Sequence, residues 1–267
     1  RYLGIGMGKW SNLKEQLAFA LPTIPSNVSS WIVDSSDKYV IGILIGSVAV
    51  GCYSPGYALG SILLMFLSPF AVLLPAVLPE HYEKGDIGEV DKYLSYSMKY
   101  YLLLTIPAAV GMSVLSKPLL YIITTPEIAL GGYMVTPFVC LGAIFMGMYG
   151  ITNNILILEK NTMILGKLWI VVAISNIVLN LLIVPYLNIL GAAIATLICY
   201  ILAFAVTAIA SKKTMRLPFN IKELLKIVSA ALIMGIAVYI MHPIGIIDVL
   251  ISIVAGVIIY FAIIFIL

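Results

Sequence analysis

Three charged side chains interrupt an otherwise apolar segment of the sequence. Asp34, Asp37 and Lys38 lie within WIVDSSDKYVIGILIG, residues 31–46. On a helix, Asp34 is one turn from both Asp37 and Lys38, so an Asp34–Lys38 ion pair is predicted. That pair leaves Asp37 available to protonate, to bind an ion or to bind a charged headgroup. The competing interpretation is a structural ion pair that fixes this helix to its neighbours.

A second group of polar residues can ligate a cation. Asn176 and Asn180 are one turn apart on a helix, and Thr196 follows on the next helix after a short turn. Their oxygens, joined by a carboxylate such as Asp34 or Asp37, are the ligands that Na⁺ accepts. Hydrogen bonding between two packed helices explains the same residues without any ion.

Asn153 and Asn154 lie in a third apolar segment, ITNNILILEKN. They are candidate substrate contacts, with interhelical hydrogen bonding as the alternative. His81 and His242 stand alone at helix ends on opposite sides of the predicted membrane, so no metal site and no catalytic residue is predicted.

Apolar helices must position all of these side chains. Of the 267 residues 62% are hydrophobic and 10% are charged, with a mean hydropathy of +1.12. A soluble domain carries about 25% charged residues, and a helix needs about 20 apolar residues to cross a bilayer. We therefore predict an all-α, polytopic bundle of about eight transmembrane helices, near 13–45, 49–80, 90–115, 128–158, 162–184, 190–211, 221–241 and 245–267.

Several predicted helices exceed the length of a single crossing and carry breakers. Kinks are predicted at Pro22, Pro25, Pro55, Pro69, Pro75, Pro107 and Pro137, where the missing backbone donor must face protein or water. The pairs Gly42/Gly46 and Gly56/Gly60 predict close helix approach.

The basic residues predict the orientation. If residues 1–12 are cytoplasmic, only Lys38 and Lys117 of the 15 Lys and Arg residues fall toward the outside. The net charge of +3 then reflects topology and not nucleic-acid binding. Connections between helices are too short for a soluble catalytic domain, so an enzyme is not expected.

Three segments together resemble a known transporter family. LPTIPSNVSSWIVDSSDKYVIGILIGSVAVGCYSPGYALG, LILEKNT and ISNIVLNLLIVPYLNILGAAIATLICY follow in order over much of residues 17–201. They are similar to the second lobe of the polysaccharide-exporter branch of the multidrug/oligosaccharidyl-lipid/polysaccharide (MOP) superfamily. The MATE-like members of this superfamily have two six-helix lobes, often followed by two further helices.

The resemblance implies a domain organisation. A cytoplasmic lead-in at 1–12 precedes a six-helix second lobe at 13–211, and a cytoplasmic loop at 212–220 precedes an additional helix pair at 221–267. The first six-helix lobe is then a missing partner. Because the chain starts at Arg1 and stops in FAIIFIL, it is expected to be a piece of a longer protein.

The resemblance also implies a function, which is alternating access of a flippase in the cell membrane. A cavity between the lobes takes the sugar-diphosphate headgroup of a polyprenyl carrier lipid, while the tail stays among the membrane lipids. The resemblance implies Asp34, Asp37 and Lys38 as substrate residues, with Lys38 meeting the diphosphate, and Asn153 and Asn154 are added to them as candidates from their place in the fourth helix.

No cofactor is implied beyond Na⁺ or H⁺ that drives the return step. The implied cation ligands are Asp34, Asn176, Asn180 and Thr196.

Two other classes of function stay open at this stage. A cation-coupled multidrug efflux antiporter is favoured by an isolated carboxylate in an apolar cavity, whereas the Asp and Lys combination favours an anionic substrate. A membrane glycosyltransferase or polymerase needs a large polar loop or a clustered acid–base set, and the sequence offers neither.

Overall fold

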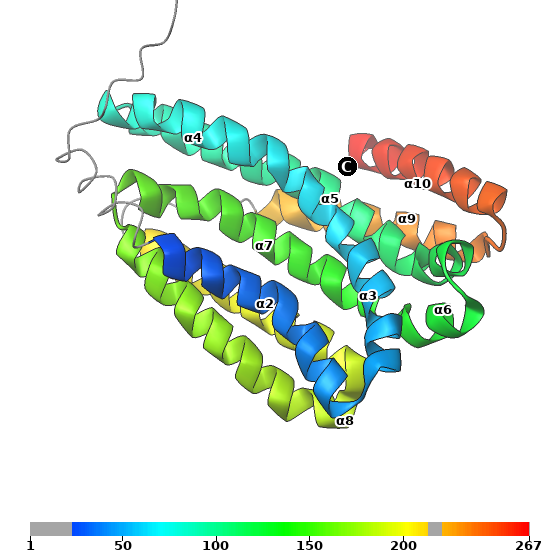
Figure 1. Cartoon of the computed structure of the whole chain (residues 1–267). Helices are drawn as coiled ribbons and strands as arrows, with labels where there is room; N and C mark the ends of the chain where they lie inside the picture. The colour runs from blue at the N-terminus through cyan, green and yellow to red at the C-terminus, as the bar shows by residue number, and fades with distance from the viewer. Residues whose placement is uncertain (1–22, 213–220, 267) are drawn as a thin grey trace, which may run out of the picture.

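Helices make up the described part of the chain, because a segment in lipid has to satisfy its own backbone hydrogen bonds. The computed structural model describes residues 23–212 and 221–266, and no strand occurs among them. The elements are α2 (Thr23–Leu44), α3 (Ser47–Ser61), the 3₁₀ helix η1 (Ile62–Leu67), α4 (Ser68–Glu83), α5 (Ile87–Ile123), α6 (Pro126–Gly132), α7 (Val135–Leu158), α8 (Thr162–Ser211), α9 (Ile221–Ile240) and α10 (Ile246–Ile266) (Figure 1).

The predicted bundle of about eight membrane helices is confirmed. Among the described residues, 6 helical stretches are long and apolar enough to cross a membrane. One of them, Met163–Ser211, contains two crossings, because α8 turns back at Asn188 (φ 51°, ψ −137°). α2 adds the remaining crossing. It is not among the 6 apolar stretches because it carries the charged residues Asp34, Asp37 and Lys38.

Several predicted helix boundaries were wrong. α5 continues to Ile123, beyond the predicted end at 115. The predicted helix 128–158 is two helices, α6 and α7, separated by a turn at 133–134. Pro137 consequently lies in the first turn of α7, where its missing amide removes no helical hydrogen bond. The predicted lead-in at 1–12 and Pro22 lie outside the described residues.

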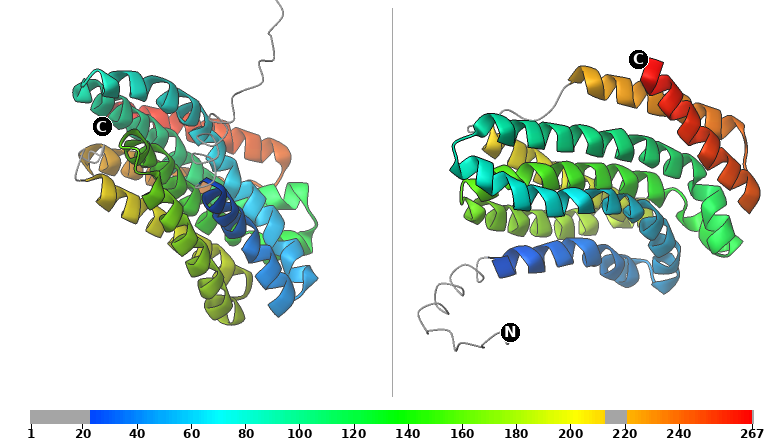
Figure 2. Two further views of the ribbon diagram at one scale, coloured as in Figure 1. Left: turned by 60° about the vertical axis from the view of Figure 1, so that its left-hand side comes forward. Right: turned by 90° about the horizontal axis from the view of Figure 1, so that it is seen from above.

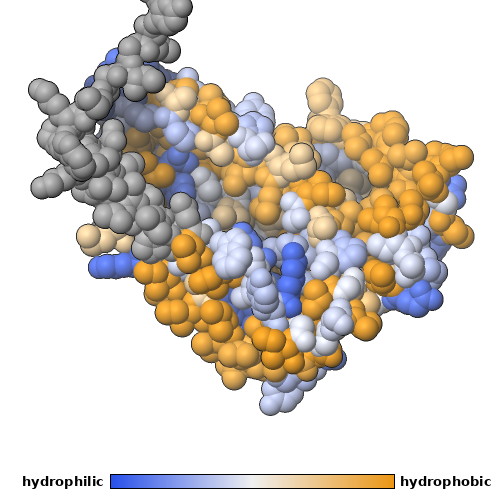
Figure 3. Space-filling view, viewed as in Figure 1, coloured by the Kyte–Doolittle hydropathy of each residue, from blue (hydrophilic) through white to orange (hydrophobic). Residues whose placement is uncertain are grey.

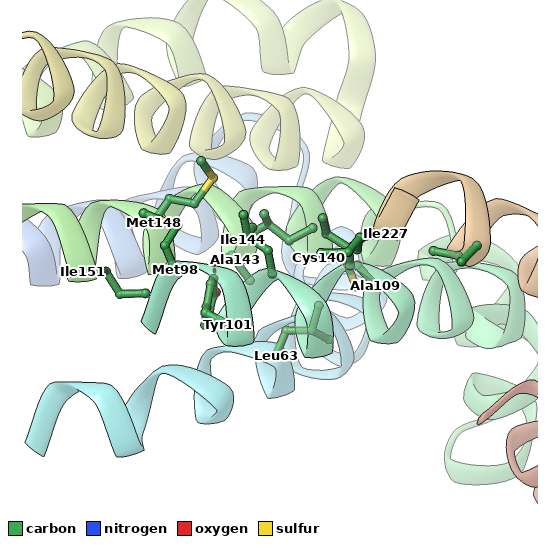
Figure 4. Close-up of a cluster of buried hydrophobic side chains, with 14 of the residues drawn as sticks. Leu63, Met98, Tyr101, Ala109, Cys140, Ala143, Ile144, Met148, Ile151 and Ile227 are labelled. Atoms are coloured by element: carbon green, nitrogen blue, oxygen red, sulfur yellow. Dashed lines mark hydrogen bonds between the residues drawn. The ribbon is translucent and has the colours of Figure 1, made fainter. Parts of the chain in front are cut away.

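α7 lies in the middle of the bundle and contacts α3, α4, α5 and α8. α2 packs on α8 and α3, whereas the α9–α10 pair packs on α5, so these two parts lie on opposite sides of the bundle (Figure 2). The main apolar core fills the space between α5 and α7 (Figure 4). There the Tyr101 hydroxyl donates to the Ala143 carbonyl at 2.8 Å.

The proline in α5 is accommodated by a neighbouring helix. Pro107 has no amide to offer to the carbonyl of Leu103, four residues earlier. The Tyr260 hydroxyl of α10 donates to that carbonyl at 2.9 Å. The expectation that a proline site faces protein is therefore confirmed at this position.

One of the two predicted glycine contacts forms. A Cβ at Gly56 or Gly60 would press on Gly132 or Val139, so α3 approaches α6 and α7 closely at these positions. Gly46 instead has a φ of +118° and precedes α3, while Gly42 makes only ordinary contact with Val50. The Gly42/Gly46 pair thus belongs to the turn between α2 and α3 and not to a helix crossing.

The close approach of α3 and α6 yields a stability prediction. In Gly132→Ala, the new Cβ would meet the backbone oxygen of Cys52, so the two helices must separate. We expect a loss of about 1–3 kcal/mol, measured as a lower unfolding temperature of the purified protein. The matched control is Gly51→Ala on α3, whose Cβ would meet nothing within 4 Å. Equal unfolding temperatures for both variants would contradict the contact.

Candidate functional site

Asp37 is almost fully enclosed, with 1% of its surface exposed. Its carboxylate accepts three hydrogen bonds: from the Tyr53 hydroxyl at 2.6 Å, from Thr196 Oγ1 at 2.7 Å and from Asn180 Nδ2 at 2.8 Å. Burying a carboxylate is costly unless such donors replace its water. The three donors come from α3 and from both halves of α8.

The donors are themselves held in place by further hydrogen bonds. Asn176 Nδ2 donates to Thr196 Oγ1 at 3.2 Å, and the Ser36 hydroxyl donates to Asn176 Oδ1 at 2.5 Å. Asn180 Nδ2 also reaches the backbone oxygen of Asn176 at 3.0 Å. We call Asp37, Tyr53, Asn176, Asn180 and Thr196 the Asp37 cluster.

The turn in α8 explains how residues distant in sequence meet in the Asp37 cluster. Asn180 and Thr196 are equally far from Asn188, one before it and one after it. Since the chain reverses at Asn188, the two side chains return to the same depth in the bundle. Their predicted meeting across the turn is therefore confirmed, while the carboxylate that joins them is Asp37 and not Asp34.

The Asp37 cluster has the composition of a site for a hard cation. Asn180 Nδ2 donates to Asp37, while Asn180 Oδ1 is buried and has no hydrogen-bond partner, so the cluster holds one unused acceptor. Carboxylate, amide and hydroxyl oxygens are the ligands that hard cations prefer. Within the described residues, no group of three or more His, Cys, Asp or Glu side chains lies together.

Asp34 and Lys38 lie on the outer side of α2 and are both exposed. The Tyr200 hydroxyl donates to Asp34 at 2.9 Å, and Lys38 Nζ lies 5.6 Å from the centre of the Tyr57 ring. The predicted Asp34–Lys38 ion pair is wrong, because neither residue forms an ion pair within residues 23–212 and 221–266. We call the surface formed by Asp34 and Lys38 of α2 and Tyr57 of α3 the α2 polar face.

The α2 polar face stands out against its apolar surroundings. Hydrophilic side chains gather along α2 in Figure 3, on a side of the molecule that is otherwise largely hydrophobic. Charged groups inside a membrane-spanning segment have to face protein or a water-filled cavity. This face therefore borders an aqueous or protein-lined space.

Asn153 and Asn154 lie on α7, which packs between α5 and α8. Asn154 Nδ2 donates to the carbonyls of Gly150 and Ile151 at 2.9 and 3.1 Å, so it turns back on its own helix. Asn153 is half-buried. Among the described residues, no hydrogen bond joins either asparagine to the α2 polar face.

Sequence reasoning missed the tyrosines of the site. Tyr53 holds Asp37, Tyr200 holds Asp34, and Tyr57 lies beneath Lys38. The sequence indicated only that each tyrosine hydroxyl in an apolar helix needs a hydrogen-bond partner. Nothing in the spacing indicated which carboxylate each tyrosine would meet.

Comparisons with known proteins find three kinds of similarity. A family model described as MatE matches residues 22–182. The probable low-salt glycan biosynthesis flippase Agl15 of Haloferax volcanii is 21% identical over 201 residues, covering 75% of this chain and 41% of that protein. A solved structure titled lipid II flippase MurJ, inward closed conformation, has a TM-score of 0.75 at 24% identity, covering 98% of this chain and 55% of that one. The chain thus spans about half the length of the proteins that it matches.

The hydrogen bonds of Thr196 yield a second stability prediction. Thr196→Val removes one donor from Asp37 and the acceptor of Asn176, and we expect a loss of about 1–3 kcal/mol. The measurement is thermal unfolding of the purified protein. Thr105→Val is the matched control, because Thr105 is equally buried but bonds only to the Tyr101 carbonyl of its own helix. A larger loss in the control than in Thr196→Val would show that the Asp37 cluster does not stabilise the fold.

Proposed function

Because the chain belongs to the MatE family, we propose that it forms part of a flippase for lipid-linked oligosaccharide or polysaccharide precursors. The flippase would carry the sugar-diphosphate headgroup across the cell membrane by alternating access, and no covalent step is involved. The names of the glycan flippase and of the lipid II flippase support this proposal. The main structural support is the exposure of Lys38, a cation within a membrane bundle that has no ion-pair partner among the described residues.

The proposal assigns the α2 polar face to the headgroup cavity. Lys38 offers its ammonium to the diphosphate, and Asp34 accepts hydrogen bonds from sugar hydroxyls. The other wall of the cavity is the first six-helix lobe, which is proposed as the partner of residues 13–211. Exposed charges on α2 support this arrangement, because lipid would not tolerate them.

The orientation is part of the proposal. The N-terminal end of the chain would be cytoplasmic, since most basic residues then fall on the inner side. Among the described residues, Lys84 and Lys92 flank the α4–α5 connection and form surface ion pairs with Glu80 and Glu89, while Lys99 of α5 pairs with Glu223 at the start of α9. The headgroup would be taken up at this side of the membrane.

Lys38→Ala tests the headgroup contact. In vesicles containing the full-length parent protein and a fluorescent lipid-linked oligosaccharide, the headgroup becomes protected from an external quencher as it moves. We expect Lys38→Ala to slow this movement at least about tenfold, because a charge-assisted hydrogen bond contributes about 1.5–3 kcal/mol. Lys38→Arg should keep most of the rate.

Lys117→Ala is the matched control for this experiment. Lys117 is also exposed and also lies over a tyrosine ring, 5.7 Å from the centre of Tyr133, but it is on α5. Its loss should leave the rate within about twofold of wild type. The proposal fails if the wild-type protein moves no lipid-linked sugar and instead expels cationic drugs along an ion gradient, which is the behaviour of an efflux antiporter.

The Asp37 cluster is proposed as the coupling-ion site, with Na⁺ as the favoured ion. Asp37, Asn180 and Thr196 supply carboxylate, amide and hydroxyl oxygens at one depth of the bundle. The unpaired Asn180 Oδ1 supports a ligand role. Asp34 is left out of this site, because it lies on the exposed side of α2 and bonds to Tyr200.

Sodium removal tests the coupling-ion site. Replacing Na⁺ by choline at equal ionic strength should lower the unfolding temperature of wild type by about 2–4 °C per kcal/mol of binding. Asp37→Asn should abolish this difference, whereas Asp34→Asn should keep it. Indifference of the wild-type protein to Na⁺, together with transport driven by a pH gradient, would identify H⁺ as the ion instead.

A further inference from the structure

Trp31 lies on the same stripe of α2 as Asp34 and Lys38. The three residues are three and four positions apart, so they follow one another along one side of the helix. Trp31 is 60% exposed, whereas Val33 on the opposite side of α2 is fully buried. A large aromatic ring therefore extends the α2 polar face by about one turn beyond Asp34.

The exposed half of α2 has two different edges. At 100° per residue, Trp31 is about 20° from Lys38 and about 80° from Tyr39 around the helix axis. Asp34 and Lys38 form the polar edge, next to Tyr200 and Tyr57. The other edge carries Tyr39 and Ile43, which are 63% and 82% exposed. Trp31 belongs to the polar edge.

The spacing along α2 suits a phosphate with a sugar beside it. At 1.5 Å per residue, Trp31 is about 10 Å from Lys38 along the helix, and Asp34 lies between them. This is roughly the reach of a diphosphate and its first sugar ring. The order of chemistry along the stripe is thus cation, carboxylate and aromatic ring.

From this order we infer that Trp31 is the platform on which the first sugar ring of the lipid-linked substrate stacks. The inference rests on the proposed flippase function. One face of a pyranose ring carries mostly C–H groups, which pack on an indole ring, while the hydroxyls at its rim point sideways to a carboxylate such as Asp34. Trp31 thereby selects for a sugar, whereas Lys38 recognises only the charge of the phosphates.

The test compares two substrates and four variants in the full-length parent protein. The substrates are a polyprenyl diphosphate that carries a fluorescent oligosaccharide and the same diphosphate lipid with a fluorescent label but no sugar. We expect Trp31→Ala to slow movement of the glycosylated lipid about tenfold and to leave movement of the sugar-free lipid unchanged. Trp31→Phe should keep a rate within about threefold of wild type, because it retains an aromatic ring.

Tyr39→Ala is the matched control, since it removes an exposed aromatic ring from the other edge of α2. It should move both lipids at the wild-type rate. If Trp31→Ala moves the glycosylated lipid normally while Lys38→Ala does not, the platform is overturned and the flippase proposal stands. If the wild-type protein moves neither lipid, the sugar platform and the flippase proposal are both overturned. Slow movement of both lipids by Trp31→Ala, despite a wild-type unfolding temperature, also overturns the platform.

Discussion

A single buried carboxylate governs how this bundle is assembled. Asp37 lies in an apolar environment, and its charge is tolerated only because three donors from α3 and α8 converge on it. Those donors can converge only if α8 reverses at Asn188 and if α3 turns away from α2 at Gly46. The position of α2 relative to two other elements is therefore set by one charge and its hydrogen bonds.

The two acidic residues of α2 have opposite environments although they are three residues apart. Asp37 faces α8 and is enclosed, whereas Asp34 is exposed and bonds to Tyr200. A helix that carries both groups joins an internal cluster to an external face without any intervening loop. A change in the hydrogen bonds of Asp37 would shift or rotate α2 as a rigid helix, and Asp34 and Lys38 would move with it.

The sequence alone predicted the helical class, the number of crossings and the meeting of Asn176, Asn180 and Thr196, because each depends on local apolar length or on helical spacing. It did not predict which carboxylate joins them, since three residues of spacing places Asp34 and Asp37 on the same half of a helix. The predicted end of α5 was also wrong. Lys117 and Pro118 are typical of the end of a membrane span, but both lie inside the 37-residue helix α5.

The hydrogen bond between Tyr260 and Leu103 joins residues 157 positions apart in the sequence. Without the hydroxyl, the carbonyl released by Pro107 would face an apolar cavity of about 320 Å³ whose lining includes Leu103, Gly256 and Tyr260. The bend of α5 is thus completed by α10, the last helix that the structure describes. α9 and α10 are therefore structural members of the bundle, and without them α5 would be left with an unsolvated carbonyl dipole.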